Sequence, residues 1–120
     1  MKKILIIEDE KILREALKEG LAMSDWQIFE AGDGKTAREI FSQEEIELIL
    51  VDIKLPDESG INLLREFKHS NPGLKVIVLT AYEAYRSDFE IWAEGLLDYI
   101  VKPVDLSALK KKIENIFKKS

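Results

Sequence analysis

The sequence contains no cysteine, which excludes a disulfide framework, a thiolate metal site and a cysteine nucleophile. It also lacks any apolar run that approaches the roughly 20 residues of a membrane-spanning helix. The first apolar run, Ile4–Ile7, is followed directly by Glu8 and Asp9 and is too short for a secretion signal. We therefore expect a protein that is neither secreted nor inserted in a membrane, with a cytoplasmic location.

An excess of positive charge and a glycine-rich phosphate loop are missing as well. The formal net charge is −5, whereas nucleic-acid-binding domains are typically basic, so we expect no direct contact with nucleic acid. The chain has no Gly-rich loop of the Walker type, which argues against a bound nucleotide. What is present is a chain of 120 residues, 46% hydrophobic and 34% charged, which predicts one globular domain over residues 1–120.

Short apolar runs alternate with longer amphipathic stretches along the chain. This alternation is typical of βα units around a parallel sheet, and a continuous apolar run is typical of a central strand covered on both faces. Five such units predict an α/β fold with a flavodoxin-like, doubly wound, five-stranded parallel sheet, (βα)5, in strand order 2-1-3-4-5. The strands are expected at Ile4–Ile7, Trp26–Ala31, Ile46–Val51, Val76–Leu79 and Leu97–Val101, and the last two helices at Ala84–Glu94 and Leu106–Lys119.

Five polar residues stand at the carboxyl ends of these expected strands: Glu8, Asp9, Asp52, Thr80 and Lys102. In an open parallel sheet, ligands bind in the crevice outside such ends, at the switch point of the strand order, here between strands 1 and 3. The three acids fall at that point, where each like-charge pair at ~4 Å costs on the order of 4 kcal/mol. A fold keeps such a cluster when a cation is bound or a proton is shared. Oxygen ligands without His or Cys indicate Mg²⁺ or Mn²⁺ rather than zinc.

The hydroxyl and the ammonium of this set suit a phosphoryl group. Lys102 would bind its oxygens through charge and Thr80 through a hydrogen bond. Because the chain has no phosphate-binding loop, we expect the phosphoryl group to be attached covalently to the protein, as an aspartyl-phosphate, rather than carried on a bound nucleotide. Asp52 is the best candidate because it ends its strand alone, whereas Glu8 and Asp9 are adjacent. Each residue also fits an ordinary role, such as a helix cap, a turn or a surface charge, but their joint occurrence at strand ends favours a site.

Short motifs around these residues stand in a characteristic order. They are Glu8-Asp9 after the run Ile4–Ile7, Asp52-Ile-Lys-Leu-Pro56 followed by Gly60, Thr80-Ala81, and Gly95 leading to Asp98-Tyr99-Ile-Val-Lys102-Pro103. In this order and at these intervals they resemble the receiver domains of two-component response regulators, and the resemblance extends over essentially the whole chain. Any single motif is weak, but the ordered set is highly specific.

The resemblance implies a role for each residue of the cluster. Asp52 would accept a phosphoryl group from a phosphohistidine of a sensor histidine kinase. Asp9, Asp52 and the backbone carbonyl of Lys54 would bind Mg²⁺. Glu8 would act on the metal through a water molecule, and Lys102 would pair first with Asp52 and then with the phosphoryl group.

The resemblance also implies a conformational switch. Thr80 would swing inward to the phosphate and draw Tyr99 from an exposed to a buried position. This movement would change the face formed by the fourth helix, the fifth strand and the last helix, and so control dimerisation or output. The Lys102–Pro103 peptide bond would be cis.

The sequence departs from the family pattern at two places. Glu8 stands where Asp is commoner, and we expect its longer side chain to shift the metal geometry. Leu96 follows Gly95 where the family usually has Ala, and we expect the added bulk to change the packing between the fourth helix and the fifth strand, beside the Tyr99 switch.

Three aromatic residues form a stripe on the fourth expected helix. Tyr85, Phe89 and Trp92 share one side, away from Ala84 and Ile91, which match the core positions of the family. One interpretation is partial exposure on the face that receivers use for dimerisation or output contact. The other is ordinary packing in the core.

These features predict a phosphorylation-controlled signalling switch that catalyses only its own phosphorylation and dephosphorylation and is not an enzyme with a free substrate. An Mg²⁺-dependent phosphohydrolase with an aspartyl nucleophile is an alternative, but it would usually carry a second acid where this chain has Lys54. A degenerate receiver that only binds proteins would be free to lose the five site residues. The expected partner is a sensor histidine kinase; an output domain outside this chain and a homodimer remain open.

Overall fold

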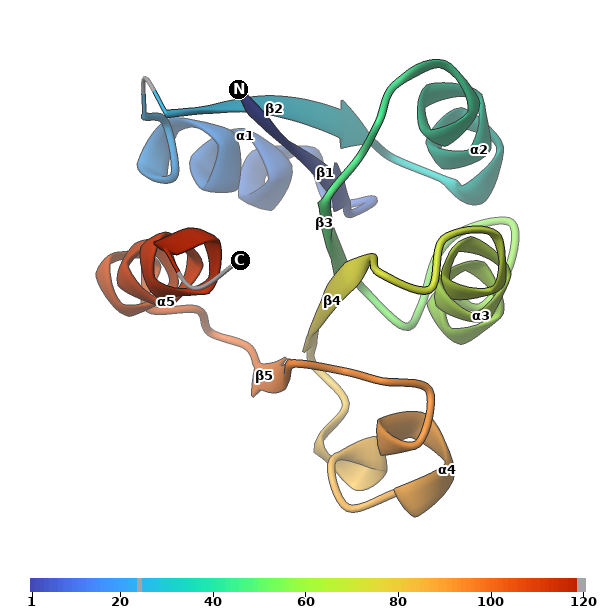
Figure 1. Cartoon of the computed structure of the whole chain (residues 1–120). Coiled ribbons are helices and arrows are strands. Elements are labelled where there is room, and N and C mark those ends of the chain that lie inside the picture. Colours follow the sequence, from blue (N-terminus) through green and yellow to red (C-terminus); the bar gives the residue numbers. More distant parts are fainter. Residues whose placement is uncertain (24, 119–120) are drawn as a thin grey trace.

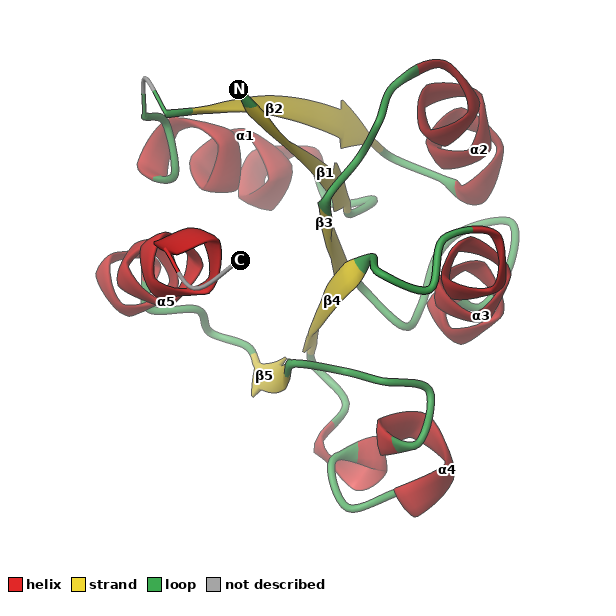
Figure 2. Cartoon of the chain, viewed as in Figure 1, coloured by secondary structure: helices red, strands yellow, loops and turns green. Residues whose placement is uncertain are grey.

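The computed structural model of the chain describes residues 1–23 and 25–118. At its centre lies a parallel sheet in the order β2-β1-β3-β4-β5, which confirms the predicted flavodoxin-like fold and strand order. Figures 1 and 2 show this sheet between two layers of helices. β3 and β5 begin slightly later than predicted, β1 and β4 begin slightly earlier, and β4 ends one residue later. The strands are β1 (Lys2–Ile7), β2 (Trp26–Ala31), β3 (Leu48–Val51), β4 (Lys75–Thr80) and β5 (Asp98–Val101).

Helices cover both faces of the sheet. α1 and α5 contact each other on one face, and α2 and α3 contact each other on the opposite face (Figure 1). The prediction for the last helix included Lys119, which lies outside the described residues. The helices are α1 (Lys11–Gly20), α2 (Gly34–Gln43), α3 (Gly60–Ser70), α4 (Phe89–Trp92) and α5 (Leu106–Lys118).

Strand side chains alternate between two hydrophobic cores, one on each face. In β1, Leu5 and Ile7 join the core beneath α2 and α3, while Ile4 and Ile6 join the core beneath α1 and α5. The residues of β3 and β4 alternate in the same way. Both faces of these strands therefore need apolar side chains, which explains their continuous apolar runs. The edge strand β2 instead mixes buried with more exposed positions.

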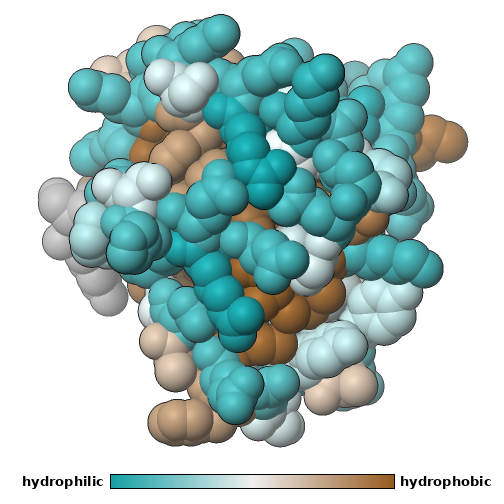
Figure 3. Space-filling view, turned by 90° about the vertical axis from the view of Figure 1, so that its right-hand side faces the viewer, coloured by the Kyte–Doolittle hydropathy of each residue, from teal (hydrophilic) through white to brown (hydrophobic). Residues whose placement is uncertain are grey.

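The helices turn polar side chains outward. Figure 3 views the side that carries α2 and α3, where hydrophilic residues cover most of the surface and a hydrophobic area shows in the lower middle. Among the described residues, no helix is both long enough and apolar enough to cross a membrane.

The chain between β4 and β5 differs from its prediction. The expected helix Ala84–Glu94 is replaced by a 3-10 turn, η1 (Glu83–Tyr85), and by α4, which spans only Phe89–Trp92. Ile91 is buried, as expected for a core position. Ala84, which was expected in the core, is exposed. The prediction of one continuous fourth helix was therefore wrong.

Side chains interrupt this helix by binding backbone groups that a continuous helix would use. The Asp88 carboxylate accepts from the Glu90 amide at 2.9 Å, and the Trp92 indole donates to the Arg86 carbonyl at 2.5 Å. In an α-helix the Glu90 amide would donate to the Arg86 carbonyl, four residues earlier. Because both groups have other partners, the α-helix begins only at Phe89.

Candidate functional site

The carboxyl ends of β1 and β3 bring three acidic side chains together. Glu8 and Asp9 follow β1, Asp52 follows β3, and these two strands are direct neighbours in the sheet. The Asp52 amide extends their pairing by donating to the Ile7 carbonyl at 3.0 Å. Carboxylate oxygens of the three acids all lie within 4.8 Å of one another. The fold thus assembles the expected acidic cluster at the switch point of its strand order.

Lys102 reaches this cluster from the end of β5. Its amide donates to the Thr80 carbonyl at 2.8 Å, which ties the ends of β4 and β5 together. Its Nζ lies 2.8 Å from an Asp52 oxygen and 2.8 Å from a Glu8 oxygen. Glu10, an acid that the sequence did not single out, lies 3.5 Å from the same nitrogen. The ammonium therefore faces more negative charge than it can balance alone.

Burial makes this charge balance important. Glu8 and Asp52 are only 2% and 6% exposed. Burial raises the pKa of Glu8, against the opposing effect of the Lys102 ammonium. Burial also favours the neutral form of Lys102, but the adjacent Asp52 and Glu8 carboxylates outweigh it and raise the pKa of Lys102. Lys102 is therefore charged at neutral pH.

The ligands in this cluster suit a hard divalent cation. The three side chains that converge all offer carboxylate oxygens, which Mg²⁺ and Mn²⁺ prefer. Glu8 and Asp52 are buried, whereas Asp9 is exposed, so the cluster has a side open to solvent. A divalent cation there would balance the negative charge that Lys102 leaves uncompensated.

Asp52 is also held by the loop that follows it. Its Oδ1 accepts from the Lys54 amide at 3.2 Å, while its Oδ2 accepts from Lys102. Gly60 lies against the Asp52 carbonyl, and a Cβ at Gly60 would stand only 1.9 Å from that oxygen. The Gly60 amide closes the loop by donating to the Ile53 carbonyl at 2.6 Å. The glycine of the sequence motif is therefore needed for this close approach.

Thr80 and Tyr99 both bind the backbone of Tyr82. Thr80 is fully buried, and its hydroxyl accepts from the Tyr82 amide at 3.4 Å. Tyr99 is 1% exposed, and its hydroxyl donates to the Tyr82 carbonyl. Burial, with smaller effects of Tyr85 and Asp52, raises the pKa of Tyr99 to about 12. Of the two positions expected for Tyr99, the structure has the buried one.

Pro103 and the aromatic stripe are the remaining residues singled out from the sequence. The Lys102–Pro103 peptide is cis, as the resemblance implied. Tyr85, Phe89 and Trp92 are 41%, 81% and 36% exposed, so ordinary core packing does not explain the stripe. They do not share one helix, since Tyr85 belongs to η1.

Sequence reasoning missed Arg14, which holds the backbone of the acidic pair. Its Nη1 donates to the Glu8 carbonyl at 2.8 Å and to the Asp9 carbonyl at 3.5 Å. Its Nε donates to the Glu30 carboxylate at 3.2 Å. No local motif marks these contacts, because Arg14, the acidic pair and Glu30 belong to different elements.

Comparisons with known proteins find one family. The family model described as "Response regulator receiver domain" matches residues 4–114. The virulence transcriptional regulatory protein PhoP of Salmonella typhimurium is 31% identical over 120 residues, which are 100% of this chain and 54% of that protein. The chain thus spans about half the length of the first curated relatives it matches.

Solved structures share the fold. The response regulator protein TrrA of Thermotoga maritima, in complex with Mg²⁺-BeF, is 36% identical with a TM-score of 0.84, and the match covers 96% of this chain and 98% of that one. A CheY-like receiver domain protein of Methanospirillum hungatei is 29% identical with a TM-score of 0.90, covering 99% and 95% of the two chains.

Proposed function

The chain belongs to the response regulator receiver family, and on this premise we propose that it is a phosphorylation-controlled signalling switch of a two-component system. Asp52 is the proposed phosphoacceptor, and a sensor histidine kinase supplies the phosphoryl group from a phosphohistidine. One observation carries the proposal. The buried Asp52 carboxylate lies 2.8 Å from the Lys102 ammonium, within a cluster of oxygens suited to a divalent cation.

In the proposed transfer, an oxygen of Asp52 attacks phosphorus and forms an O–P bond. The N–P bond to the kinase histidine breaks, and its electron pair stays on the imidazole. Lys102 stabilises the phosphoryl oxygens, and its charge acts more strongly in this buried setting than in water. Asp9, Asp52 and the Lys54 carbonyl would hold Mg²⁺ or Mn²⁺, and Glu8 would act through a water. Neutralisation of charge on the transferred group is what the bound cation supplies.

Tyr82 links the two residues of the proposed switch, since Thr80 binds its amide and Tyr99 its carbonyl. A phosphoryl group on Asp52 offers strong acceptor oxygens to the Thr80 hydroxyl. In this proposal Thr80 rotates toward the phosphoryl group, and this rotation breaks its 3.4 Å contact with the Tyr82 amide. The segment after β4 then keeps its contact with Tyr99 but loses its contact with Thr80. Its new position changes the face formed by α4, β5 and α5.

This face is the proposed output of the switch. Exposed Phe89 and Trp92 of α4, together with exposed Tyr85 of η1, suit contact with a second copy of the chain or with an output domain outside residues 1–120. Sedimentation velocity with and without Mg²⁺ and beryllofluoride tests the homodimer, and a monomer under both conditions would contradict it. Residues 1–120 form one receiver domain in this proposal. It acts in the cytoplasm, makes no direct contact with nucleic acid and turns over no free substrate.

Covalent labelling tests the proposed function. Wild-type protein incubated with Mg²⁺ and acetyl phosphate should gain one phosphoryl group, measured as intact mass, and Asp52→Asn should gain none. Asp33→Asn is the matched control, because it changes an acid that caps α2, and it should be labelled like wild type. Repeated hydrolysis of a phosphate ester would support a phosphohydrolase instead. Absence of any adduct would contradict both functions.

A further inference from the structure

The loop between Asp52 and α3, residues 53–59, closes on itself beside the acidic cluster. The Leu55 amide donates to the Glu58 carbonyl at 3.2 Å, and Lys54 pairs with Ser59 in an antiparallel bridge. These bonds give the loop its shape. Its position relative to the cluster depends also on its contacts with other elements.

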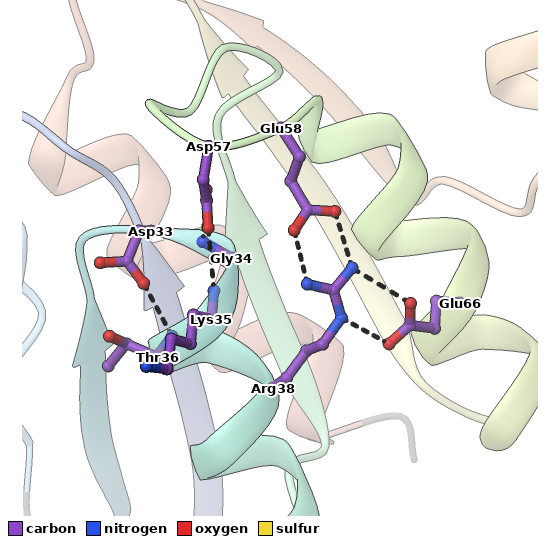
Figure 4. A network of polar contacts seen from close by, with 8 residues as sticks. All are labelled: Asp33, Gly34, Lys35, Thr36, Arg38, Asp57, Glu58 and Glu66. Atoms are coloured by element: carbon purple, nitrogen blue, oxygen red, sulfur yellow. Dashed lines mark hydrogen bonds and ion pairs between the residues drawn. The ribbon is translucent and has the colours of Figure 1, made fainter.

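Asp57 fastens this loop to the start of α2. Its carboxylate oxygens accept from the Gly34 amide at 2.9 Å and from the Lys35 amide at 3.2 Å (Figure 4). The helix has its own N-cap in Asp33, which accepts from the Thr36 amide at 2.7 Å. Asp57 therefore supplies acceptors to two further amides of the first helical turn. The Gly34 amide is the main group that lowers the pKa of Asp57, so the carboxylate stays ionised.

Glu58 forms a second connection, through Arg38. The Arg38 guanidinium donates to the two Glu58 oxygens at 2.5 and 2.7 Å and to the two Glu66 oxygens at 2.9 and 3.2 Å (Figure 4). Bidentate pairs of this kind fix the orientation of the guanidinium relative to each carboxylate. Arg38 thus joins α2, the loop and α3. The approach is so close that a Cβ at Gly34 would lie 2.2 Å from a Glu58 oxygen.

We propose that Asp57 and Arg38 are positioning residues for the metal site, an inference that rests on the proposed function. They hold the loop against α2 and thereby fix the backbone of Lys54. Its amide binds Asp52 at 3.2 Å, and its carbonyl is the proposed metal ligand. Groups that hydrogen-bond directly to a metal ligand typically change metal affinity about 10–100-fold when they are lost. Asp57 and Arg38 act on the loop that carries the ligand, so we expect an effect at the lower end of that range. A single exposed ion pair contributes little, so the effect comes from the contacts of Asp57 and Arg38 acting together on one short loop.

This coupling must work in both directions. If Asp57 and Arg38 favour the metal-binding position of the loop, bound Mg²⁺ must favour their contacts in return. The Gly34 and Lys35 amides, which donate to Asp57, should therefore exchange with solvent more slowly when Mg²⁺ is bound. Amide exchange at these two positions reports the coupling without any phosphoryl transfer.

Calorimetric titration with Mg²⁺ separates loop positioning from helix stability. Asp57→Ala and Arg38→Met should each weaken Mg²⁺ binding by about tenfold. Asp57→Asn, which keeps one acceptor oxygen, should fall between wild type and Asp57→Ala. Asp33→Ala is the matched control, because it removes a cap from the same helix end without touching the loop. It should cost helix stability but leave the Mg²⁺ affinity close to that of wild type.

The outcomes separate this inference from the proposed function. Equal Mg²⁺ affinities for wild type, Asp57→Ala and Arg38→Met would overturn the inference and leave the proposed function intact. Failure of the wild type to bind Mg²⁺ would overturn both. If a variant unfolds, amide exchange in the wild type still tests the coupling. Slower exchange of the Gly34 and Lys35 amides with Mg²⁺ supports the coupling, and unchanged exchange overturns it.

Discussion

Lys102 is the residue on which the charge balance of the site depends. Its ammonium lies 2.8 Å from oxygens of both Glu8 and Asp52. Both acids are buried, so without the ammonium two like charges would face each other where water screens them poorly. The side chain that the proposed mechanism uses to stabilise phosphoryl oxygens therefore also holds the unphosphorylated site together.

Lys102→Met should lower the free energy of unfolding by about 3 kcal/mol, because it leaves two buried carboxylates without their cation. Mg²⁺ should restore more stability to this variant than to wild type, since it would take over part of the compensation. Urea unfolding with and without Mg²⁺ measures both effects. Lys112→Met, which breaks a more exposed pair with Asp98, is the control and should cost at most about 1 kcal/mol. Equal losses in the two variants would show that Lys102 does not stabilise the cluster.

The Tyr99 phenol should titrate at about pH 12, above the ordinary value of 10.0, because burial disfavours its ionised form. Folding favours the neutral phenol, so its contribution to stability is complete below the unfolded pKa and is lost as the pH rises towards the folded pKa of about 12. The tyrosinate absorbance of wild type minus that of Tyr99→Phe isolates this step. A difference centred near pH 10 would show that Tyr99 is exposed to solvent.

At the scale of elements, the strands could be predicted from the sequence and the fourth helix could not. A strand buried on both faces requires a continuous apolar run such as Ile4–Ile7, so its place follows from local composition. The break in the fourth helix depends on which group binds each backbone carbonyl. The spacing of Tyr85, Phe89 and Trp92 fits a helix and gives no sign that the Trp92 indole binds the Arg86 carbonyl.

The amides of α4 should exchange with solvent faster than those of α3. α4 has 4 residues and α3 has 11, and the side chain of Phe89 is 81% exposed, so little packing opposes local opening of α4. If the proposed switch operates, Mg²⁺ with beryllofluoride should alter exchange in α4 more than in α3. Hydrogen exchange followed by mass spectrometry measures both. Equal protection of the two helices would contradict this expectation.

At the scale of the whole molecule, some contacts of the site can be predicted from the sequence and others cannot. Asp52, Thr80 and Lys102 could be singled out because each stands where an apolar run ends, and parallel strands bring such ends to one edge. The contact of Asp57 with Gly34 spans 23 residues and has no periodic or motif signal. Contacts of this kind depend on how α2 and the loop pack against each other, and local sequence patterns do not predict that packing.

Phosphoryl transfer to Asp52 is tested most directly by locating the acyl phosphate on the chain. Protein labelled with acetyl phosphate and Mg²⁺ is treated with sodium borohydride, which reduces an aspartyl-phosphate to homoserine, and its peptides are mapped by mass spectrometry. We predict homoserine in place of Asp52, with Glu8 and Asp9 unmodified. Reduction at any other acid, or a protein that remains unlabelled, would contradict the assignment of Asp52 as phosphoacceptor.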